Sequence, residues 1–210
     1  MIFLTSAGFL NPMVFQLIRE NRKSSINNAC IITTGITIGK EKHPDAQKTK
    51  EYLAGQGIDE VNFLDVEIED SSVLRQYDLI VILGGNSNHL FYHLKRSGAD
   101  KYLRQHAEIG KDIVGASAGA WFLGAGRQLA DEFSALVGID ETYPEPVDLN
   151  GLNFIPEHIF PHYDMFAERV ENLNEKVSAL EDKHGVKIIR LKNMDFMYKD
   201  NDGKIHTVIT

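Results

Sequence analysis

The sequence predicts an α/β protein built on a doubly wound, mostly parallel sheet. Short apolar runs recur along the chain up to residue 116, and a polar segment of helical length separates most of them. The runs are almost continuously apolar, which is typical of parallel strands covered by helices on both faces. A turn rich in glycine and alanine follows the run at residues 113–116, so we also expect a nucleophile elbow at the sheet edge.

The elements follow in a regular order. The apolar runs predict strands at residues 2–4, 29–32, 61–64, 79–83 and 113–116. The segments between them predict helices at residues 13–22, 44–56, 88–97 and 100–109. Residues 126–151 contain two prolines and three glycines, which predict an excursion of loops and short strands.

The last third of the chain changes pattern. From residue 165, apolar side chains recur at steps of three and four and predict a helix. Its expected end is Lys183-His184-Gly185, where cationic residues precede a glycine stop. Residues 186–191, 196–198 and 205–209 then predict strands, and residues 200–203 predict the hairpin turn that joins the last two.

Length and composition restrict the classes of protein. The 210 residues predict one domain, residues 1–210, of ordinary soluble composition with 43% hydrophobic residues. The 22 basic and 30 acidic residues give a net charge of −8, which argues against a nucleic-acid partner. Cys30 is the single cysteine, so the chain can form no internal disulfide and no cysteine-based zinc site. No apolar run suits a signal peptide or a membrane span. We therefore expect a cytoplasmic protein with no membrane partner, either monomer or homodimer.

The motif with chemical meaning is Gly115-Ala116-Ser117-Ala118-Gly119. It follows a predicted strand directly and opens a helix expected over residues 118–123. A serine on such a strand-to-helix turn adopts a strained conformation with its hydroxyl exposed, and the small neighbours allow close packing. We predict that Ser117 is a nucleophile; the alternative is a turn that serves packing alone.

A second glycine pair precedes the helix expected at residues 88–97. Gly84 and Gly85 end the strand before it, and loops at the carboxyl ends of parallel strands border one crevice. The N–H groups of Gly85 and Ala118 would form an oxyanion hole with two donors. The other interpretation of this loop is a helix start capped by Asn86 or Ser87, and the two are compatible.

A serine nucleophile needs a base, and the chain has eight histidines. His162 lies on an expected loop after Pro161 and ahead of a helix, which favours it. His206 near the end of the chain would suit a carboxylesterase of α/β-hydrolase type. His89 lies close to Gly85 and is a candidate for lining the pocket. Four further histidines lie in polar stretches of the sequence, which predicts that their side chains are solvated: His43, His93, His106 and His184.

Three blocks together resemble peptidase family S51, the family of α-aspartyl dipeptidases (dipeptidase E) and cyanophycinases. They are Leu83-Gly84-Gly85-Asn86, the serine block up to Ala120, and Leu152-Asn153-Phe154-Ile155-Pro156 leading to Pro161-His162-Tyr163-Asp164. The resemblance implies a class I glutamine-amidotransferase-like (flavodoxin-like) fold, with serine where the amidotransferases have cysteine. It implies Ser117 as nucleophile, His162 as base, and Gly85 with Ala118 as oxyanion donors, without a metal or other cofactor.

The resemblance also suggests where a third catalytic residue lies. Asp140, 22 residues before His162, matches the family's acid upstream of the histidine, and Asp131 is a second choice. On the late loop, Asn193 falls where the family has an acid, and Asp195 lies two residues further on. A substrate carboxylate would need a cation nearby, for which Arg127, His89 and His158 are candidates.

These features lead to two functional hypotheses. The first is a serine peptidase, of dipeptidase type, that cleaves a small peptide after an N-terminal residue through an acyl-enzyme; the resemblance implies aspartate as that residue. The second is a non-catalytic family member that binds small molecules or peptides, an interpretation that Asn193 favours because an amide cannot stabilise an imidazolium charge.

Overall fold

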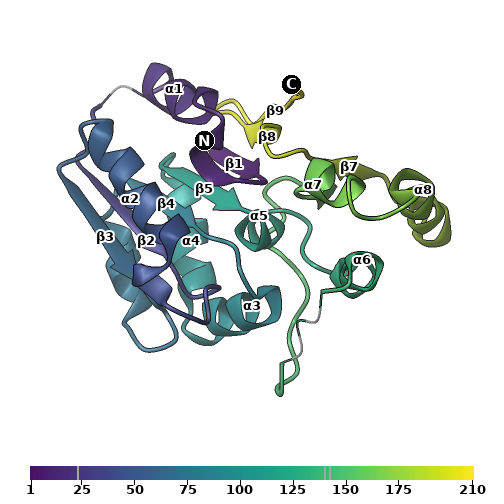
Figure 1. Ribbon diagram of the computed structural model, residues 1–210. Coiled ribbons are helices and arrows are strands. Elements are labelled where there is room, and N and C mark those ends of the chain that lie inside the picture. Colours follow the sequence, from purple (N-terminus) through teal and green to yellow (C-terminus); the bar gives the residue numbers. More distant parts are fainter. Residues whose placement is uncertain (23, 140, 142) are drawn as a thin grey trace.

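The computed structural model describes residues 1–22, 24–139, 141 and 143–210. Its centre is a seven-stranded sheet in the order β3-β2-β4-β5-β1-β8-β9 (Figure 1). The first five strands in this order are parallel, whereas β8 and β9 join antiparallel at one side. The strand bounds are β1 Ile2–Thr5, β2 Asn28–Ile32, β3 Glu60–Leu64, β4 Leu79–Ile82, β5 Asp112–Ala116, β8 Phe196–Lys199 and β9 Ile205–Val208. The predicted mostly parallel α/β fold is thus confirmed.

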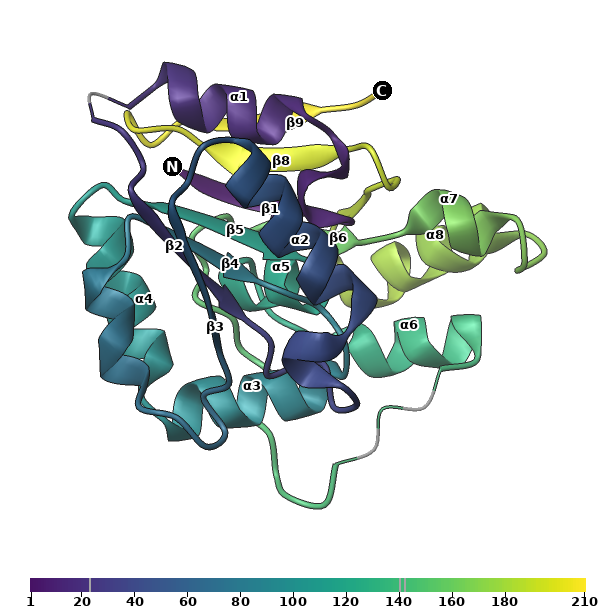
Figure 2. The same ribbon diagram turned by 60° about the vertical axis from the view of Figure 1, so that its left-hand side comes forward.

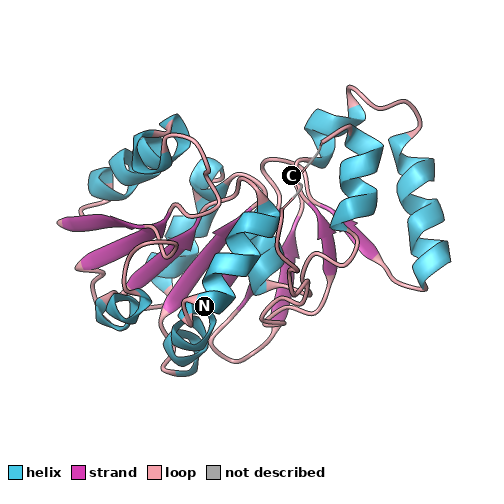
Figure 3. Ribbon diagram, turned by 90° about the horizontal axis from the view of Figure 1, so that it is seen from below, coloured by secondary structure: helices cyan, strands magenta, loops and turns pink. Residues whose placement is uncertain are grey.

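Helices cover both faces of this sheet, as the view from below shows (Figure 3). The α-helices are α1 Met13–Glu20, α2 Pro44–Gly55, α3 Ser87–Arg96, α4 Ala99–Glu108, α5 Ala118–Leu123, α6 Ala130–Val137, α7 Tyr163–Ala167 and α8 Leu173–His184. The 3₁₀ helices are η1 Gly8–Leu10, η2 Lys40–Lys42 and η3 Ser71–Gln76. No helix in the described part of the chain is long and apolar enough to cross a membrane.

The core divides according to the alternation of side chains along the strands. In β1, Leu4 packs into the cluster that contains α3, α4 and α5, whereas Phe3 packs into the cluster that contains α1 and α2. Figure 2 shows α1 and α2 on one side of the strands. Strands buried on both faces require apolar residues at every position, which explains the continuous apolar runs of the sequence.

A third apolar cluster lies beside the main sheet, where α6, α7 and α8 pack on a second sheet of two parallel strands. These strands are β6 (His158–Phe160) and β7 (Ile188–Arg190). Figures 1 and 2 both show α7 and α8 together on that side of the molecule. The predicted strand at residues 186–191 therefore exists in shortened form, but outside the main sheet.

Two predictions for this region are wrong. Residues 126–151 contain the helix α6 besides loops, because apolar side chains spaced four apart, Leu129, Phe133 and Val137, give it a face that joins the third cluster. The continuous helix expected from residue 165 is divided into α7 and α8. Between the two helices, Asn172 adopts a left-handed conformation with a φ of 54°, so α7 ends before this residue and α8 begins after it. The predicted stop at Gly185 is confirmed, with φ of 63°.

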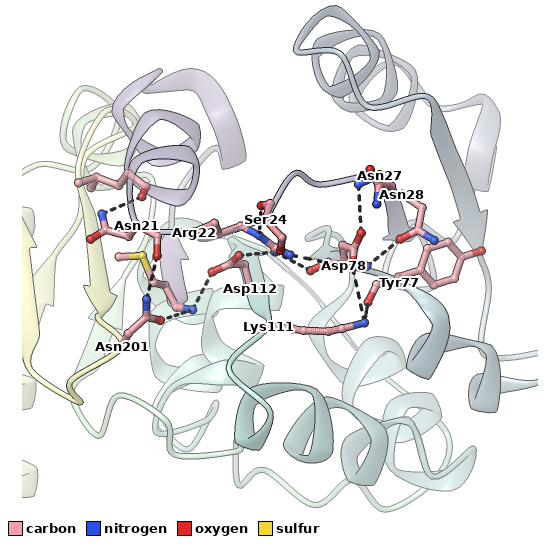
Figure 4. A network of polar contacts seen from close by, with 12 residues as sticks. Asn21, Arg22, Ser24, Asn27, Asn28, Tyr77, Asp78, Lys111, Asp112 and Asn201 are labelled. Atoms are coloured by element: carbon pink, nitrogen blue, oxygen red, sulfur yellow. Dashed lines mark hydrogen bonds and ion pairs between the residues drawn. The ribbon is translucent and has the colours of Figure 1, made fainter.

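The edge of the sheet opposite the Ser117 turn is held by buried charges (Figure 4). Asp112 opens β5 and accepts hydrogen bonds from the Met1 ammonium group and from Arg22 Nη1, both at 2.7 Å. Arg22 also donates to the carbonyl oxygen of Asp78, at 3.1 Å. Asp112 is 1% exposed, so its charge is stabilised by these two cations rather than by water.

Candidate active site

Ser117 occupies the turn between β5 and α5, as the sequence predicts. Its φ of 52° and ψ of −114° lie in a region that non-glycine residues rarely adopt. The Ser117 N–H donates to the carbonyl oxygen of Thr5 on β1 at 2.9 Å, which fixes the turn to the neighbouring strand. The side chain is partly exposed and lines a cavity. A strained, solvent-facing serine between a strand and a helix has the geometry of a nucleophile elbow.

The glycines of the motif are required by packing. A Cβ atom on Gly119 would lie 2.2 Å from the carbonyl oxygen of Ile82, and one on Gly115 would lie 2.5 Å from the carbonyl oxygen of Gly119. Both distances are shorter than any real contact of a Cβ atom allows. The packing interpretation of the motif and the nucleophilic interpretation are therefore compatible, since close packing is what presents Ser117 at the sheet edge.

The Gly84–Gly85 loop lies directly beside this turn. A Cβ on Gly84 would lie 2.7 Å from Cβ and 3.2 Å from Oγ of Ser117, so only glycine fits there. Gly85 has a φ of 112°. Asn86 caps α3, because its side chain accepts a hydrogen bond from the His89 N–H at 2.9 Å. The N–H groups of Gly85 and Ala118 donate no hydrogen bond to any described residue, which leaves them available to an oxyanion.

His162 is the N-cap residue of α7 and has a left-handed conformation with φ of 57°. Its N–H donates to Ser6 Oγ at 3.1 Å, and Ser6 Oγ donates to the carbonyl oxygen of Leu191 at 3.0 Å. His162 lines the same cavity as Ser117. Among the described residues, no hydrogen bond joins the side chains of Ser117 and His162, and a catalytic base can come into contact with its nucleophile only once substrate binds.

The imidazole of His162 is oriented by Asn193. The distance between His162 Nδ1 and Asn193 Oδ1 is 2.6 Å. An amide oxygen only accepts hydrogen bonds, so this contact suits the tautomer with the proton on Nδ1, in which Nε2 is the nitrogen that can accept a proton. Asn193 in turn donates its backbone N–H to Asp164 Oδ1 at 3.1 Å. Of the residues suggested as third member, Asn193 is the one that contacts His162 in the described part of the chain.

The acids suggested as third catalytic residue either make other contacts or lie outside the described residues. The carboxylate of Asp195 is 1% exposed and accepts hydrogen bonds from the backbone of Lys192 and from the backbone and hydroxyl of Thr210, at 2.9–3.0 Å. Asp131 is largely exposed and pairs with Arg127 at 3.0 Å. Asp140 lies outside the described residues.

The cations suggested for a substrate pocket do not line this cavity. Arg127 is 2% exposed, and its guanidinium donates to Ser87 Oγ at 2.9 Å, to Asn88 and to Asp131. His89 contacts Glu67. His158 lies on β6, where burial and then the positive charge of His184 lower its pKa.

Two histidines expected to be solvated are buried instead. His93 is 8% exposed and His106 is 2% exposed. Burial lowers the pKa of His106 to about 4. His206 pairs with Asp200 at 2.7 Å within the β8–β9 hairpin and does not line the cavity. Cys30 is also buried, which raises the pKa of its thiol.

The cavity has a volume of about 840 Å³ and opens where the parallel strands end. The turns after β1, β2, β4 and β5 form its floor, and the start of α2 adds His43, Asp45 and Lys48. Sequence reasoning missed these three residues because they belong to an ordinary polar helix start. The available signal was topological, since β2 neighbours β4 and the loops after both strands must open on the same edge.

The fold and this geometry define an α/β protein with a strained serine on a strand-to-helix turn at the carboxyl edge of its sheet. The sequence matches peptidase family S51 over residues 6–205, and the chain belongs to this family.

Several relatives and solved structures are similar to this chain. A peptidase of Pasteurella multocida named as uncharacterized is 29% identical over 113 residues, which are 53% of each chain. A Peptidase E of Shewanella amazonensis is 26% identical over 129 residues, which are 61% of this chain and 50% of that protein. The chain thus spans about half the length of the curated relatives that it matches.

Two crystal structures share the fold. One, of a candidate peptidase E protein from Listeria monocytogenes, superposes with a TM-score of 0.73 at 22% identity, covering 99% of this chain and 96% of the other. A peptidase from an acI-B1 Actinobacterium gives a TM-score of 0.65 at 17% identity, covering 99% and 86%.

Proposed function

We propose that this protein is a serine peptidase that cleaves short peptides through an acyl-enzyme. The observation that carries the proposal is that a strained Ser117 and a His162 whose Nδ1 contacts Asn193 line one cavity. The cavity volume of about 840 Å³ is in the range of small-ligand sites and is large enough for a dipeptide.

The first half of the reaction acylates Ser117. His162 Nε2 accepts the hydroxyl proton while Ser117 Oγ attacks the carbonyl carbon of the scissile amide. The resulting oxyanion accepts hydrogen bonds from the N–H groups of Gly85 and Ala118. The tetrahedral intermediate collapses, the C–N bond breaks, and the proton on His162 passes to the leaving amine.

The second half releases the acyl group. Water gives a proton to His162 Nε2 as its oxygen attacks the ester carbonyl, the same two N–H groups stabilise the oxyanion, and the proton returns to Ser117 Oγ as the C–O bond breaks. Asn193 keeps the reactive tautomer but adds no negative charge to the imidazolium. Asp140 remains our prediction for an acidic contribution, which the variant Asp140→Asn tests.

The cavity's charges support a preference for an N-terminal aspartyl residue. Lys48 lies on the cavity wall, where its ammonium group suits a side-chain carboxylate. Asp45 on the same helix start suits an α-ammonium group. Leu10 and Ile38 add exposed apolar surface at the cavity, 55% and 84% exposed, for the residue that leaves.

Release of p-nitroaniline from aspartyl-p-nitroanilide and a panel of other aminoacyl anilides tests the proposal. We expect turnover by the wild type, loss of at least about 10³-fold in His162→Ala, and nearly full activity in His206→Ala. The two histidine variants form a matched pair, since His206 lies in the distant hairpin. Equal losses in both variants, or a greater loss in His206→Ala, would reject His162 as the base.

A second candidate function is peptide binding without catalysis, which Asn193 favours because the His162 partner carries no charge. It predicts that short peptides bind but are not hydrolysed, and that Ser117→Ala binds them as well as the wild type does. Hydrolysis that depends on Ser117 rejects it.

A further inference from the structure

Three side chains with metal-ligating atoms converge away from the candidate active site. His89 and His93 lie one turn apart on α3, with ring centroids 4.4 Å apart. Glu67, on the loop that follows β3, reaches both of them. Its Oε2 is 3.1 Å from His89 Nε2, and its Oε1 is 3.8 Å from His93 Nε2.

The spacing and the chemistry of these groups suit a transition-metal ion. One ligand atom from each residue lies within 4.8 Å of the other two. Tetrahedral coordination at ~2.1 Å places ligand atoms ~3.4 Å apart, so small side-chain rotations close the site. Two imidazoles and one carboxylate form a ligand set that zinc ions use, with a water molecule as fourth ligand.

Lys40 is the feature that opposes a metal ion. Its Nζ lies 2.8 Å from Glu67 Oε2 and 2.9 Å from Asp65 Oδ2. Glu67 and Asp65 carry two negative charges and Lys40 one positive charge, so the three groups together have a net charge of −1. Lys40 contacts one oxygen of Glu67, and the other oxygen faces His93.

The cluster is accessible and separate from the active-site cavity. A second cavity of about 560 Å³, lined in part by Glu67 and His93, gives an ion a route to the ligands. The Tyr143 hydroxyl lies 3.0 Å from His93 Nε2 and would yield that position to a metal. None of the three ligand residues lines the cavity of Ser117.

We propose that Glu67, His89 and His93 form a binding site for one divalent transition-metal ion of the zinc class. The ion would fasten α3 to the loop after β3. Because α3 starts two residues after Gly85, a bound metal would stiffen the helix that follows the oxyanion loop. The site has no part in the serine chemistry, and its failure would leave the proposed function untouched.

Titration with Co²⁺ and Zn²⁺ tests this site on the full chain. We expect one Co²⁺ per chain with visible absorption bands that Zn²⁺ removes. His89→Gln and Glu67→Gln should each weaken Zn²⁺ binding at least tenfold in calorimetry. Lys40→Gln should strengthen it severalfold, because the competing charge is gone. The matched control is His184→Gln, since His184 also pairs with a carboxylate, Glu132 at 2.7 Å, but belongs to no such cluster.

Several results would overturn the proposal. One is the absence of visible bands with Co²⁺. Another is wild-type affinity in both His89→Gln and Glu67→Gln, and a third is an equal loss in His184→Gln. The Lys40→Gln variant guards against misfolding as an explanation, because a gain in affinity cannot come from a damaged fold.

Discussion

Replacing Asn193 by aspartate should accelerate the reaction. The substitution is nearly isosteric and retains the contact to His162 Nδ1, which is 2.6 Å long. The imidazolium already makes a charge-assisted hydrogen bond to the amide, and a carboxylate adds the attraction of an opposite charge, about 1 kcal/mol at ~4 Å in water and more where water is partly excluded. The imidazolium formed in the transition state therefore gains about 1 kcal/mol or slightly more, which corresponds to a rise in kcat of about five- to tenfold.

Asp164 limits this gain. Its carboxylate accepts the backbone N–H of residue 193 at 3.1 Å, so a new carboxylate would lie close to an existing one. Asn193→Ala tests the orienting role by itself. Loss of the contact frees the imidazole to rotate, and misplacement of a catalytic group by about 1 Å can cost ~10²-fold in rate.

The assay is kcat and KM for aspartyl-p-nitroanilide with wild type, Asn193→Asp and Asn193→Ala. Asn174→Asp is the matched control, because Asn174 is an exposed residue near the start of α8 and the charge change is the same. Equal reductions of kcat in Asn193→Asp and Asn193→Ala, or an unchanged kcat in both, would contradict this prediction.

Three further perturbations test other parts of the account. Asp112→Ala leaves two cations at a buried position and should lower the free energy of unfolding by about 3–5 kcal/mol, measured by urea denaturation; a loss below 1 kcal/mol would contradict this. The pKa of His106 is lowered to about 4 by burial, with Lys111 adding to the effect, so protonation favours the unfolded chain. The contribution of His106 to the free energy of unfolding is constant above the ordinary histidine pKa of about 6.5. About 3 kcal/mol of that free energy should be lost as the pH falls from there to about 4. His106→Leu should flatten that part of the stability curve, and an unchanged slope would show that other groups cause it. Lys48→Met should raise KM for the aspartyl substrate about two- to fivefold relative to the alanyl substrate, and an equal change for both would remove Lys48 from specificity.

Local patterns predicted most of the central sheet. Continuous apolar runs identified the five parallel strands, and the small residues around Ser117 identified the elbow, because both follow from constraints within a few residues. The hairpin at residues 200–203 is a further case. Asp200 and Gly203 are joined by the turn hydrogen bond between their backbone groups, at 3.1 Å, as their sequence indicates.

Long-range packing decided the features that the sequence did not reveal. The apolar spacing of α6 is visible in the sequence, but it lies in a stretch whose prolines and glycines predict loops, and its face is covered through long-range packing: the rings of Phe133 and Phe160 on β6 stack with their centroids 4.5 Å apart. The break at Asn172 lets α7 and α8 pack on the same small sheet, which no periodicity signals. β6 and β7 are distant in sequence, and three-residue strands give weak patterns.

The candidate site likewise contains residues that motifs predict and residues that only the fold brings together. Ser117, Gly85 and His162 belong to motifs, and their positions follow from the sequence. The contact of Asn193 with His162 bridges 31 residues, and only the fold shows that Asn193 rather than Asp195 makes it. The order of the strands also brings Lys48 to the cavity and Glu67 to two histidines of α3. No local sequence pattern predicts either position.

Covalent labelling with a fluorophosphonate tests most directly whether Ser117 is an activated nucleophile. We expect intact-mass analysis to show one label per chain, peptide mapping to place it on Ser117, and His162→Ala to be labelled much more slowly. Ser117→Ala should remain unlabelled. A wild-type protein that resists the reagent, or a label that persists in Ser117→Ala, would show that Ser117 is not an activated nucleophile.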